Sequence, residues 1–489
     1  MASRPPSSSR RRPRTIVNDP PGFAPVRGGG RTIGLRLVSP AGLARYRKKA
    51  GARERRWIEA TGFKAETHRF LTVPAVDGLV SHVLVGFDSA DPEAVLYGLS
   101  HLPGALAPGR YRIEPDHSDP APDLAMLEQL CLGWALGAYR FERFKSTPSG
   151  EQGARLAWPD GVDSAHVARL ARAVGRTRDL VNLPASDLGP AELAAAARDL
   201  AREFGARCHV ISGAALLKKN YPAIYAVGQG SDRPPCLIDL VWGRPRDPKV
   251  TLVGKGVTFD TGGLNLKPDQ AMKLMKKDMG GAAHVLGLAG ALMEAGTPIR
   301  LRVLIPAVEN SPSGRAMRPL DVVPTRKGTT IEIGHTDAEG RVILADALFE
   351  ASREKPALLL DWATLTGAAR VALGTDIAAL FANQDDLALD LMAAGERLAD
   401  PLWRLPLHQG YRTQIDSKVG DISNTGSTPY AGAITAALFL AHFVGPGVPW
   451  AHMDVMAYNI SSRPGRPEGG EALGLRAAYH LIRARFAAG

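Results

Sequence analysis

The segment GHTDAEGR (334–341) concentrates charge at the joint between two expected elements. Asp337 and Glu339 stand two residues apart, and the cation Arg341 follows two residues later. The run TTIEI before the segment alternates as a strand does, and VILADALFEA after it has helical spacing. Two carboxylates at the end of a strand could form part of a site that binds metal ions.

A second charged segment, KGVTFDTGGLNLKPDQAMKLMKKDMGGAAHV, follows the apolar run VTLVG (250–254). It contains the acids Asp260 and Asp278, the bases Lys255 and Lys267, and several glycines that let the backbone bend sharply. In open α/β sheets, ligands bind where loops leave the carboxyl ends of strands. We therefore expect the two segments to meet in one cleft, although they are far apart in the sequence.

Four carboxylates in one cleft would raise one another's pKa values unless positive charge neutralised them. Lysine and arginine side chains could do so, and so could two divalent cations about 3.5–4 Å apart, a common hydrolytic device. Oxygen ligands suit Mg²⁺ or Mn²⁺, and Zn²⁺ also accepts carboxylates. A lysine could bind metal only as the neutral amine, which requires a depressed pKa. The alternative is that each acid is a turn or cap residue, with Asp278 capping the helix after it.

Other catalytic motifs do not fit. The sequence GKG at 254–256 lacks the Lys-Ser/Thr ending of a phosphate-binding loop. Neither HExxH nor GxSxG occurs, which argues against a helix-mounted zinc protease and a serine nucleophile elbow. His452 and Asp454 could suggest a triad, but without a placed nucleophile we interpret them as structural.

The surrounding pattern predicts a two-domain α/β protein. Strands expected at TIGLRLV and SHVLVGF, a helix over 123–145 and a loop over 111–122 suggest a small N-terminal α/β domain. From about 173 onward, apolar strands alternate with helices of ten or more residues, which favours a larger domain with a mostly parallel or mixed sheet flanked by helices. The expected division is a basic disordered tail over 1–35, an N-terminal domain over 36–172 and a catalytic domain over 173–489.

The formal net charge of +11 is partly explained by the tail, since residues 1–35 carry seven arginines and one aspartate. A solvated start of the chain, a polyanion-binding arm and an organellar transit peptide are alternatives for this segment, and the last lacks an apolar helical face. The three cysteines form no CxxC pair, which fits a reducing compartment. We expect no secretory signal, because the N-terminus has no apolar region of the required kind, and no membrane span, because the longest apolar run, AGAITAALFLAHFVG, is short.

Five blocks resemble the leucyl aminopeptidase family of dinuclear-metal exopeptidases. They are VGKGVTFDTGG, KKDMGGAA, TDAEGR, ATLTGA and AGAITAALFL…PWAHMDV, in family order and spacing. The resemblance is strong over roughly 175–489 and weak before it. It implies a cytoplasmic homohexamer that releases N-terminal, leucine-like residues from peptides with a free N-terminus.

The resemblance also implies residue roles. The metal ligands would be Lys255, Asp260, Asp278, Asp337 and Glu339, holding two ions, Mn²⁺ or Zn²⁺. Lys267 would steady the developing oxyanion, and Arg341 would hold a bicarbonate that relays protons. Met275, Thr364 and Gly367 would line the pocket for the first side chain.

One departure from the family pattern lies beside the expected ligands, where His335 replaces the usual asparagine. We expect it to pack or support the site rather than bind metal, although imidazole could do either. Two rival functions stay open at this point. One is a DNA-binding or regulatory protein on a peptidase scaffold, with nucleic acid bound through the basic tail. The other is a dipeptidase or cysteinylglycinase-type specialist with the same metal site.

Overall fold

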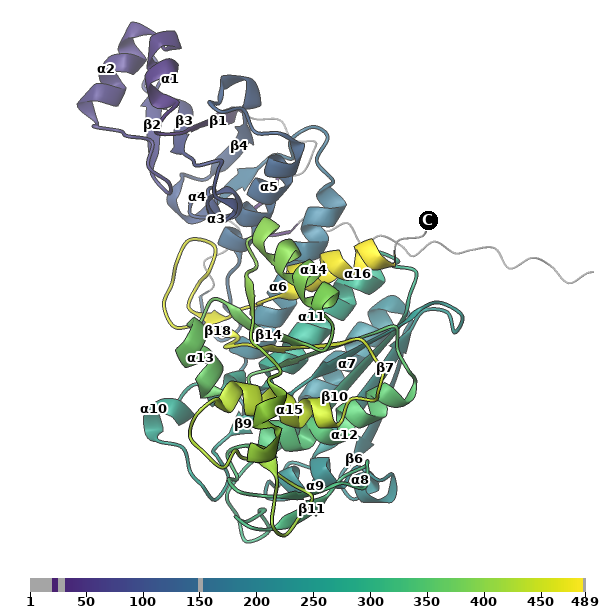
Figure 1. Ribbon diagram of the computed structural model, residues 1–489. Coiled ribbons are helices and arrows are strands. Elements are labelled where there is room, and N and C mark those ends of the chain that lie inside the picture. The colour runs from purple at the N-terminus through teal and green to yellow at the C-terminus, as the bar shows by residue number, and fades with distance from the viewer. Residues whose placement is uncertain (1–19, 25–30, 148–152, 487–489) are drawn as a thin grey trace, which may run out of the picture.

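Two α/β units follow one another along the chain, the smaller one N-terminal (Figure 1). The computed structural model describes residues 20–24, 31–147 and 153–486. Most of the expected tail lies outside the described residues. Its described part is not a solvated segment, however, because Phe23 is buried against Trp158 and β1 already begins at Thr32.

The N-terminal unit is a five-stranded sheet in the order β2-β3-β1-β4-β5. Its strands are parallel except for the edge strand β2. The elements are β1 (Thr32–Val38), α1 (Leu43–Lys49), α2 (Ala52–Ala60), β2 (Phe70–Pro74), β3 (Val80–Gly86), α3 (Pro92–Tyr97), α4 (Leu102–Ala105), β4 (Gly109–Ile113), α5 (Leu124–Ala138) and β5 (Ala154–Leu156). The predicted loop over 111–122 is therefore wrong at its start, which belongs to β4, and the helix predicted to reach residue 145 ends at Ala138.

The C-terminal unit is built on a mixed sheet in the order β15-β14-β17-β13-β8-β10-β7-β6, with β9 paired to β10. Its centre, from β17 through β13 and β8 to β10, is parallel, and β14, β7 and β6 add antiparallel pairings. The strands are β6 (Arg207–Ser212), β7 (Cys236–Trp242), β8 (Lys249–Gly254), β9 (Gly256–Asp260), β10 (Arg300–Asn310), β13 (Leu358–Ala363), β14 (Ala378–Ala382), β15 (Leu402–Arg404) and β17 (Trp450–Asp454). This confirms the mixed α/β architecture expected from the sequence.

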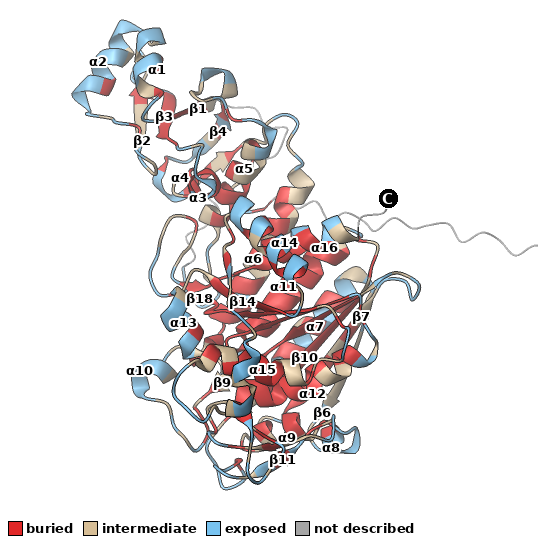
Figure 2. Cartoon of the chain, in the orientation of Figure 1, coloured by how far each residue is buried: buried red, intermediate tan, exposed pale blue. Residues whose placement is uncertain are grey.

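Helices cover both faces of this sheet, and Figure 2 shows the buried residues concentrated between these layers. One face packs on α7 (Pro190–Phe204), α11 (Gly280–Glu294) and α14 (Asp385–Arg397), with α6 (Ser164–Asn182) and α16 (Leu475–Arg485) packed against α11, and the other face packs on α9 (Pro222–Gly228), α12 (Glu339–Arg353) and α15 (Gly432–His442). Strand β13 shows why its sequence is almost wholly apolar. Leu358 and Leu360 enter one hydrophobic core, and Leu359 and Ala363 enter the other.

Smaller elements surround the ends of the strands. They are α8 (Ala215–Lys218), α10 (Asp269–Met272), the 3₁₀ helix η2 (Met275–Met279), β11 (Val322–Pro324), β12 (Thr330–Glu332), α13 (Gly367–Leu373), the 3₁₀ helix η3 (Gln409–Ile415), β16 (Ile422–Ser423), β18 (Tyr458–Asn459) and β19 (Gly469–Gly470). Strands β11, β12 and β16 form a small separate sheet, so the run TTIEI leads to the site from outside the main sheet.

The two units are joined by one continuous helix. The predicted boundary after residue 172 falls inside α6, which packs against α5 of the first unit and α11 of the second. Asp163 caps this helix by accepting a hydrogen bond from the backbone N–H of His166 at 2.9 Å. The units therefore meet through a shared helix rather than a linker at this position.

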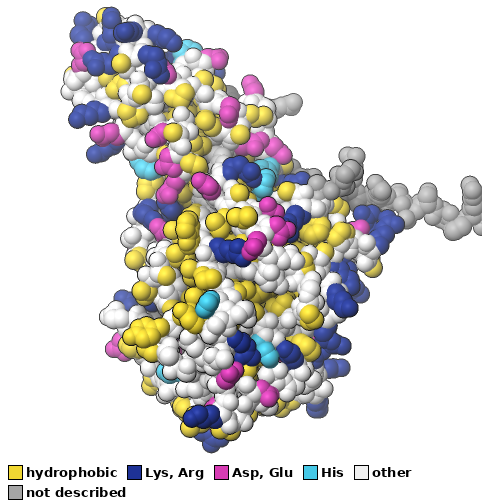
Figure 3. Space-filling view, in the orientation of Figure 1, with side chains coloured by type: hydrophobic (Ala, Val, Ile, Leu, Met, Phe, Trp, Pro, Cys, Tyr) yellow, Lys and Arg dark blue, Asp and Glu magenta, His cyan; other side chains and the backbone are white. Residues whose placement is uncertain are grey.

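The surface charge is uneven. Figure 3 shows Lys and Arg side chains gathered at the outer end of the N-terminal unit, over α1 and α2. These helices have the sequences LARYRKK and ARERRWIEA. Within the described residues, no helix is long and apolar enough to cross a membrane, and the apolar run near residue 440 forms the buried helix α15.

Candidate metal centre

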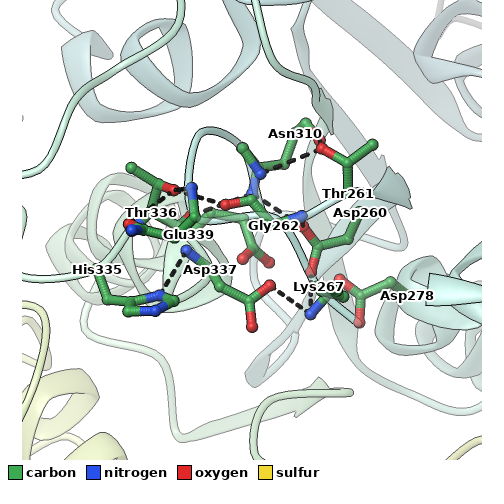
Figure 4. Close-up of polar contacts among 12 residues, drawn as sticks. Asp260, Thr261, Gly262, Lys267, Asp278, Asn310, His335, Thr336, Asp337 and Glu339 are labelled. Atoms are coloured by element: carbon green, nitrogen blue, oxygen red, sulfur yellow. Dashed lines mark hydrogen bonds and ion pairs between the residues drawn. The ribbon is translucent and has the colours of Figure 1, made fainter. Parts of the chain in front are cut away.

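The two charged segments meet at one edge of the main sheet. Asp260 ends β9, Asp337 lies in the turn before α12, and Glu339 is the first residue of α12. One carboxylate oxygen from each of these three residues lies within 4.8 Å of the other two. Figure 4 shows these carboxylates and Asp278 facing the same space, with Lys267 among them. The expected meeting of two sequence-distant bends is therefore what the structure shows.

Lys255 enters the cluster from the end of β8. Its Nζ lies 2.7 Å from Asp278 Oδ2 and 3.0 Å from Glu339 Oε1, and it donates a hydrogen bond to the backbone carbonyl of Thr364 at 2.9 Å. Gly340 makes room for it, because an added Cβ would lie 2.6 Å from Lys255 Cε. Burial lowers the pKa of Lys255, but the surrounding carboxylates outweigh burial and raise it above the ordinary lysine value.

Lys267 approaches the cluster from the loop after β9. Its Nζ lies 2.8 Å from Asp260 Oδ2 and also contacts Asp337 Oδ1. Burial lowers the pKa of Lys267, but Asp260 and the other carboxylates raise it above its ordinary value. Both lysines therefore carry charge and act as counterions for the acids in this structure.

The carboxylates have separated pKa values. Burial, and then repulsion from Asp260, raises the pKa of Glu339 to about 8. Burial and the charge of Asp278 raise the pKa of Asp260 to about 6. Burial also disfavours the charged form of Asp278, but its lysine neighbours, Lys255 first, hold its pKa below the usual value. Burial and mutual repulsion therefore disfavour the ionised forms of Asp260 and Glu339 more than the lysines favour them.

Several carboxylate oxygens lack hydrogen bonds despite being buried. Asp278 Oδ2, Asp337 Oδ1 and both oxygens of Glu339 have no hydrogen-bond partner among the described residues. The lysine contacts made by three of these oxygens are ion pairs without hydrogen-bond geometry. Buried unsatisfied acceptors are costly, and divalent cations would satisfy them. The donor set therefore fits metal ions.

Neutral side chains hold the acids in place, and the sequence motifs did not single them out. Asn310 at the end of β10 donates a hydrogen bond to Asp260 Oδ1 at 2.8 Å. Thr336 accepts a hydrogen bond from the backbone of Asn265 at 2.8 Å and donates one to the carbonyl of Gly262. Asn310 is the last residue of β10. Its position at the end of an apolar run is the feature of the sequence that could have identified it as a site residue.

His335 lies beside the cluster without joining it. Its Nδ1 accepts a hydrogen bond from the backbone N–H of Asp337 at 3.2 Å, and its side chain is turned away from the carboxylates (Figure 4). The alternative role for Asp278, capping the helix that follows it, is not observed, because the N-cap residue of α11 is Met279. Its carboxylate instead accepts a hydrogen bond from the hydroxyl of Thr364 at 2.8 Å.

A cavity of about 230 Å³ opens beside the carboxylates. The three residues expected to line the substrate pocket, Met275, Thr364 and Gly367, all line it. Lys277, Arg370 and Met456 line it too, and sequence analysis did not identify them. A larger cavity of about 680 Å³ lies along α5, α6 and α7, away from the carboxylate cluster.

Arg341 occupies the first turn of α12 and is buried. It does not line the cavity, and its Nε has no hydrogen-bond partner among the described residues. Burial lowers the pKa of Arg341 to about 10. His452 and Asp454, interpreted from the sequence as structural, both make buried polar contacts, and Asp454 also lines the cavity. His452 pairs with Asp361 at 2.6 Å, and Asp454 accepts hydrogen bonds from Thr366 and the backbone at the start of α13.

Buried acids and lysines at the strand ends of a mixed α/β sheet, with unsatisfied oxygens facing one another, define a metal-dependent hydrolase. Residues 176–479 match the catalytic domain of the cytosol aminopeptidase family, and residues 33–159 match the M17 aminopeptidase N-terminal domain. The chain belongs to the cytosol aminopeptidase family, and it is a metal-dependent aminopeptidase.

Relatives cover most of the chain. A probable cytosol aminopeptidase from Aquifex aeolicus is 36% identical over 462 residues, which is 90% of this chain and 92% of the relative. The crystal structure of cytosol aminopeptidase from Coxiella burnetii has a TM-score of 0.89 and 46% identity, covering 94% of this chain and 98% of that one. The bottromycin maturation enzyme BotP in complex with Mn has a TM-score of 0.84 and 37% identity, covering 93% and 100%.

Proposed function

We propose that Lys255, Asp260, Asp278, Asp337 and Glu339 hold two divalent metal ions, and that the site removes N-terminal residues with medium apolar side chains from peptides. The observation that carries this proposal is the set of buried carboxylate oxygens without hydrogen-bond partners. Manganese or zinc suits these ligands, and the Mn complex of BotP supports manganese. When bound, two such ions polarise a carbonyl group and make hydroxide available near neutral pH.

We assign to Lys267 a direct action on the substrate. Its Nζ lies at the open side of the cluster beside Asp260 and lines the cavity. A cation there donates a hydrogen bond to the carbonyl oxygen of the scissile bond, and that bond strengthens as negative charge develops. Arg341, a buried cation with an unpartnered Nε, is the candidate holder of a bicarbonate ion that relays protons.

The cavity accounts for removal of one residue at a time. A volume of about 230 Å³ suits a single side chain rather than an extended peptide. Met275, Thr364 and Gly367 would contact the first side chain, while the free α-amine lies near the metal cluster. The relatives are named cytosol aminopeptidases. We extend to this chain their cytoplasmic location and, from the family resemblance, a homohexameric assembly.

Metal-resolved kinetics test the proposal. We expect a chelator to abolish hydrolysis of Leu-p-nitroanilide, and Mn²⁺ or Zn²⁺ to restore it. Asp337→Asn and Glu339→Gln should each abolish activity while circular dichroism shows an intact fold. Acetylation of the substrate's N-terminus should stop cleavage. Near-normal activity of both variants would refute the ligand assignment, and equal cleavage of acetylated peptides would refute the exopeptidase geometry.

A further inference from the structure

Two cations in the wall of the catalytic cavity are not close counterions of the metal cluster. Lys277 belongs to η2 and Arg370 to α13, and both line the cavity that Met275 also lines. Lys255 and Lys267 each lie within 3.0 Å of carboxylate oxygens, as counterions do. Among the described residues, neither Lys277 nor Arg370 has a carboxylate oxygen this close, so their charge is available to a bound anion.

Lys277 is buried but weakly paired. Its nearest carboxylate atom among the described residues is Asp278 Oδ1 at 3.9 Å, beyond hydrogen-bond reach. That oxygen already accepts a hydrogen bond from Thr364 at 2.8 Å. The side chain is only 6% exposed, and no hydrogen bond from Nζ is found within the described part of the chain. A buried ammonium without acceptors is unfavourable, and a bound anion would relieve it.

Arg370 is exposed to solvent and lines the same cavity from the first turns of α13. Its one side-chain contact found among the described residues is to Met456 Sδ, at 3.7 Å from Nη1. No carboxylate of the described chain lies within 4.0 Å of its guanidinium. A guanidinium with free N–H groups matches a carboxylate well, because it can donate two parallel hydrogen bonds.

Apart from the carboxylates and lysines of the metal cluster, the wall carries the apolar side chains Met275 and Met456 and the acid Asp454, which already accepts hydrogen bonds from Thr366 and its backbone. A side chain with methylenes followed by a carboxylate would place its apolar part on the methionines and its charge toward Lys277 and Arg370. We propose that this cavity accepts an N-terminal acidic residue, glutamate in the first instance, in addition to apolar residues. This inference rests on the proposed aminopeptidase function and names a further substrate class for its first-side-chain pocket.

The comparison of glutamate with glutamine isolates the charge, because the two side chains have nearly the same shape. We measure kcat/KM for the α-p-nitroanilides of Glu, Gln and Leu with the Mn²⁺-loaded full-length enzyme. The wild type should prefer Glu to Gln by about tenfold or more, as expected when an ion pair forms in a partly desolvated pocket. Lys277→Met and Arg370→Met should each reduce that ratio to about threefold or less, a loss of selectivity expected when its charged partner is removed.

The Glu-to-Gln ratio cancels any general loss of turnover in a variant. Lys273→Met is the matched control, because Lys273 is exposed and lies outside the cavity lining, and its ratio should equal that of the wild type. A wild-type preference for Gln, or an unchanged ratio in both cavity variants, overturns the inference. Failure to hydrolyse even Leu-p-nitroanilide would instead reject the proposed function.

Lys277 and Arg370 could instead bind a different carboxylate, the C-terminal carboxylate of a short peptide substrate. If the two cations bind that group, both variants will lower kcat/KM for Leu-Leu relative to Leu-Leu-amide and leave the Glu-to-Gln ratio unchanged. That result overturns the assignment to the first side chain. The anilides carry no C-terminal carboxylate, so a ratio that falls with the variants supports the assignment directly.

Discussion

At the scale of single residues, the site brings four carboxylates together with two lysines, Lys255 and Lys267, that lie close enough to act as their counterions. Lys255 and Lys267 differ in position: one is enclosed between Asp278 and Glu339, and the other borders the cavity. An enclosed lysine is suited to holding structure or metal. A lysine at the cavity edge is suited to contacting the substrate, and this difference leads to a prediction for Lys267.

Replacement of Lys267 by alanine should lower kcat far more than it raises KM. The hydrogen bond from Nζ is expected to strengthen as the carbonyl oxygen gains charge, so its loss acts on the transition state. Losses of about 10²–10³-fold in kcat are typical for one donor of this kind. Steady-state kinetics on Leu-p-nitroanilide measure the effect, with Lys273→Ala as the matched exposed control. A pure increase in KM would contradict the assigned role.

The pKa of Glu339 predicts how metal binding depends on pH. Burial raises that pKa to about 8 in the metal-free cluster. Because the folded-state pKa lies above the unfolded value, the group stabilises the metal-free protein at low pH, and this stabilisation is lost as pH rises toward 8. Metal ions need the ionised carboxylate. The rise in Tm caused by a fixed Mn²⁺ concentration should therefore grow between pH 6 and pH 8.

Thermal unfolding with and without Mn²⁺ checks this dependence. Lys255 must also lose a proton to bind metal, and its raised pKa gives a dependence of the same sign. The pH dependence should therefore shrink, but not vanish, in Glu339→Gln. A Tm increase that is constant or falls with pH would show that proton release does not accompany metal binding at this site.

The site residues that could be predicted from the sequence are charged residues in glycine-rich loops. Asp260 and Glu339 stood out because acids follow apolar runs, and the structure brings them together. Asn310, Lys277 and Arg370 did not stand out, because each belongs to an ordinary-looking strand end or helix. Their importance depends on which elements become neighbours in three dimensions, and neither residue type nor spacing contains that information.

At the scale of elements, α12 presents one of the four acids of the cluster and is anchored to its neighbours by a further acid. Glu339 is its first residue, and Asp346, two turns later, ties the helix to its neighbours. The buried carboxylate of Asp346 accepts hydrogen bonds from the backbone N–H groups of Ala223, Ile224 and Arg326. One side chain on α12 therefore satisfies the N-terminus of α9 and the turn after β11.

Replacement of Asp346 by alanine should lower the free energy of unfolding by about 2–4 kcal/mol, because backbone donors are left buried without acceptors. Asp346→Asn keeps one of the two accepting oxygens and replaces the other by an NH₂ group that cannot accept, so it should lose less than alanine but not match the wild type. Urea unfolding followed by circular dichroism measures both variants. Equal losses for alanine and asparagine would mean that the negative charge, rather than the accepting oxygen, stabilises α9 and the turn.

The regular helices and buried strands could be predicted because their periodicity is strong. The run LLLDWA and the helix α7, opened by Pro190 and closed by the left-handed Gly205, are examples. Strand β9 was not predicted as a strand, since its sequence GVTFD reads as the start of a glycine-rich loop. It is extended because β10 is long enough to pair with both β8 and β9 along its length. Tertiary pairing decided its conformation.

At the scale of the whole molecule, the two units share one hydrophobic core. Leu35 in β1, Leu130 in α5, Leu286 in α11 and Leu475 in α16 belong to the same buried cluster. Interfaces of this kind resemble a domain interior rather than a transient contact between domains. We therefore expect the two units to unfold together in a single thermal transition.

The buried ion pair between Arg178 and Glu471 allows a test of whether the two units unfold together. Arg178, in α6, donates hydrogen bonds to both carboxylate oxygens of Glu471 at 3.1 and 2.9 Å, and to the backbone carbonyls of Leu136 and Gly465. It thus joins α5 of the first unit to the C-terminal segment of the second. Arg178→Met leaves Glu471 buried without its cation, which costs about 3–5 kcal/mol.

Calorimetry of Arg178→Met should show one transition at a lower Tm, because destabilising the junction destabilises both units. The double variant Arg178→Met/Glu471→Met should recover part of the loss, since the stranded carboxylate is then removed as well. Two resolved transitions, with only the N-terminal one shifted, would contradict the shared core. In that case the metal centre would keep its activity while the N-terminal unit unfolds around β1, and Leu-p-nitroanilide hydrolysis measured between the two transitions would reveal it.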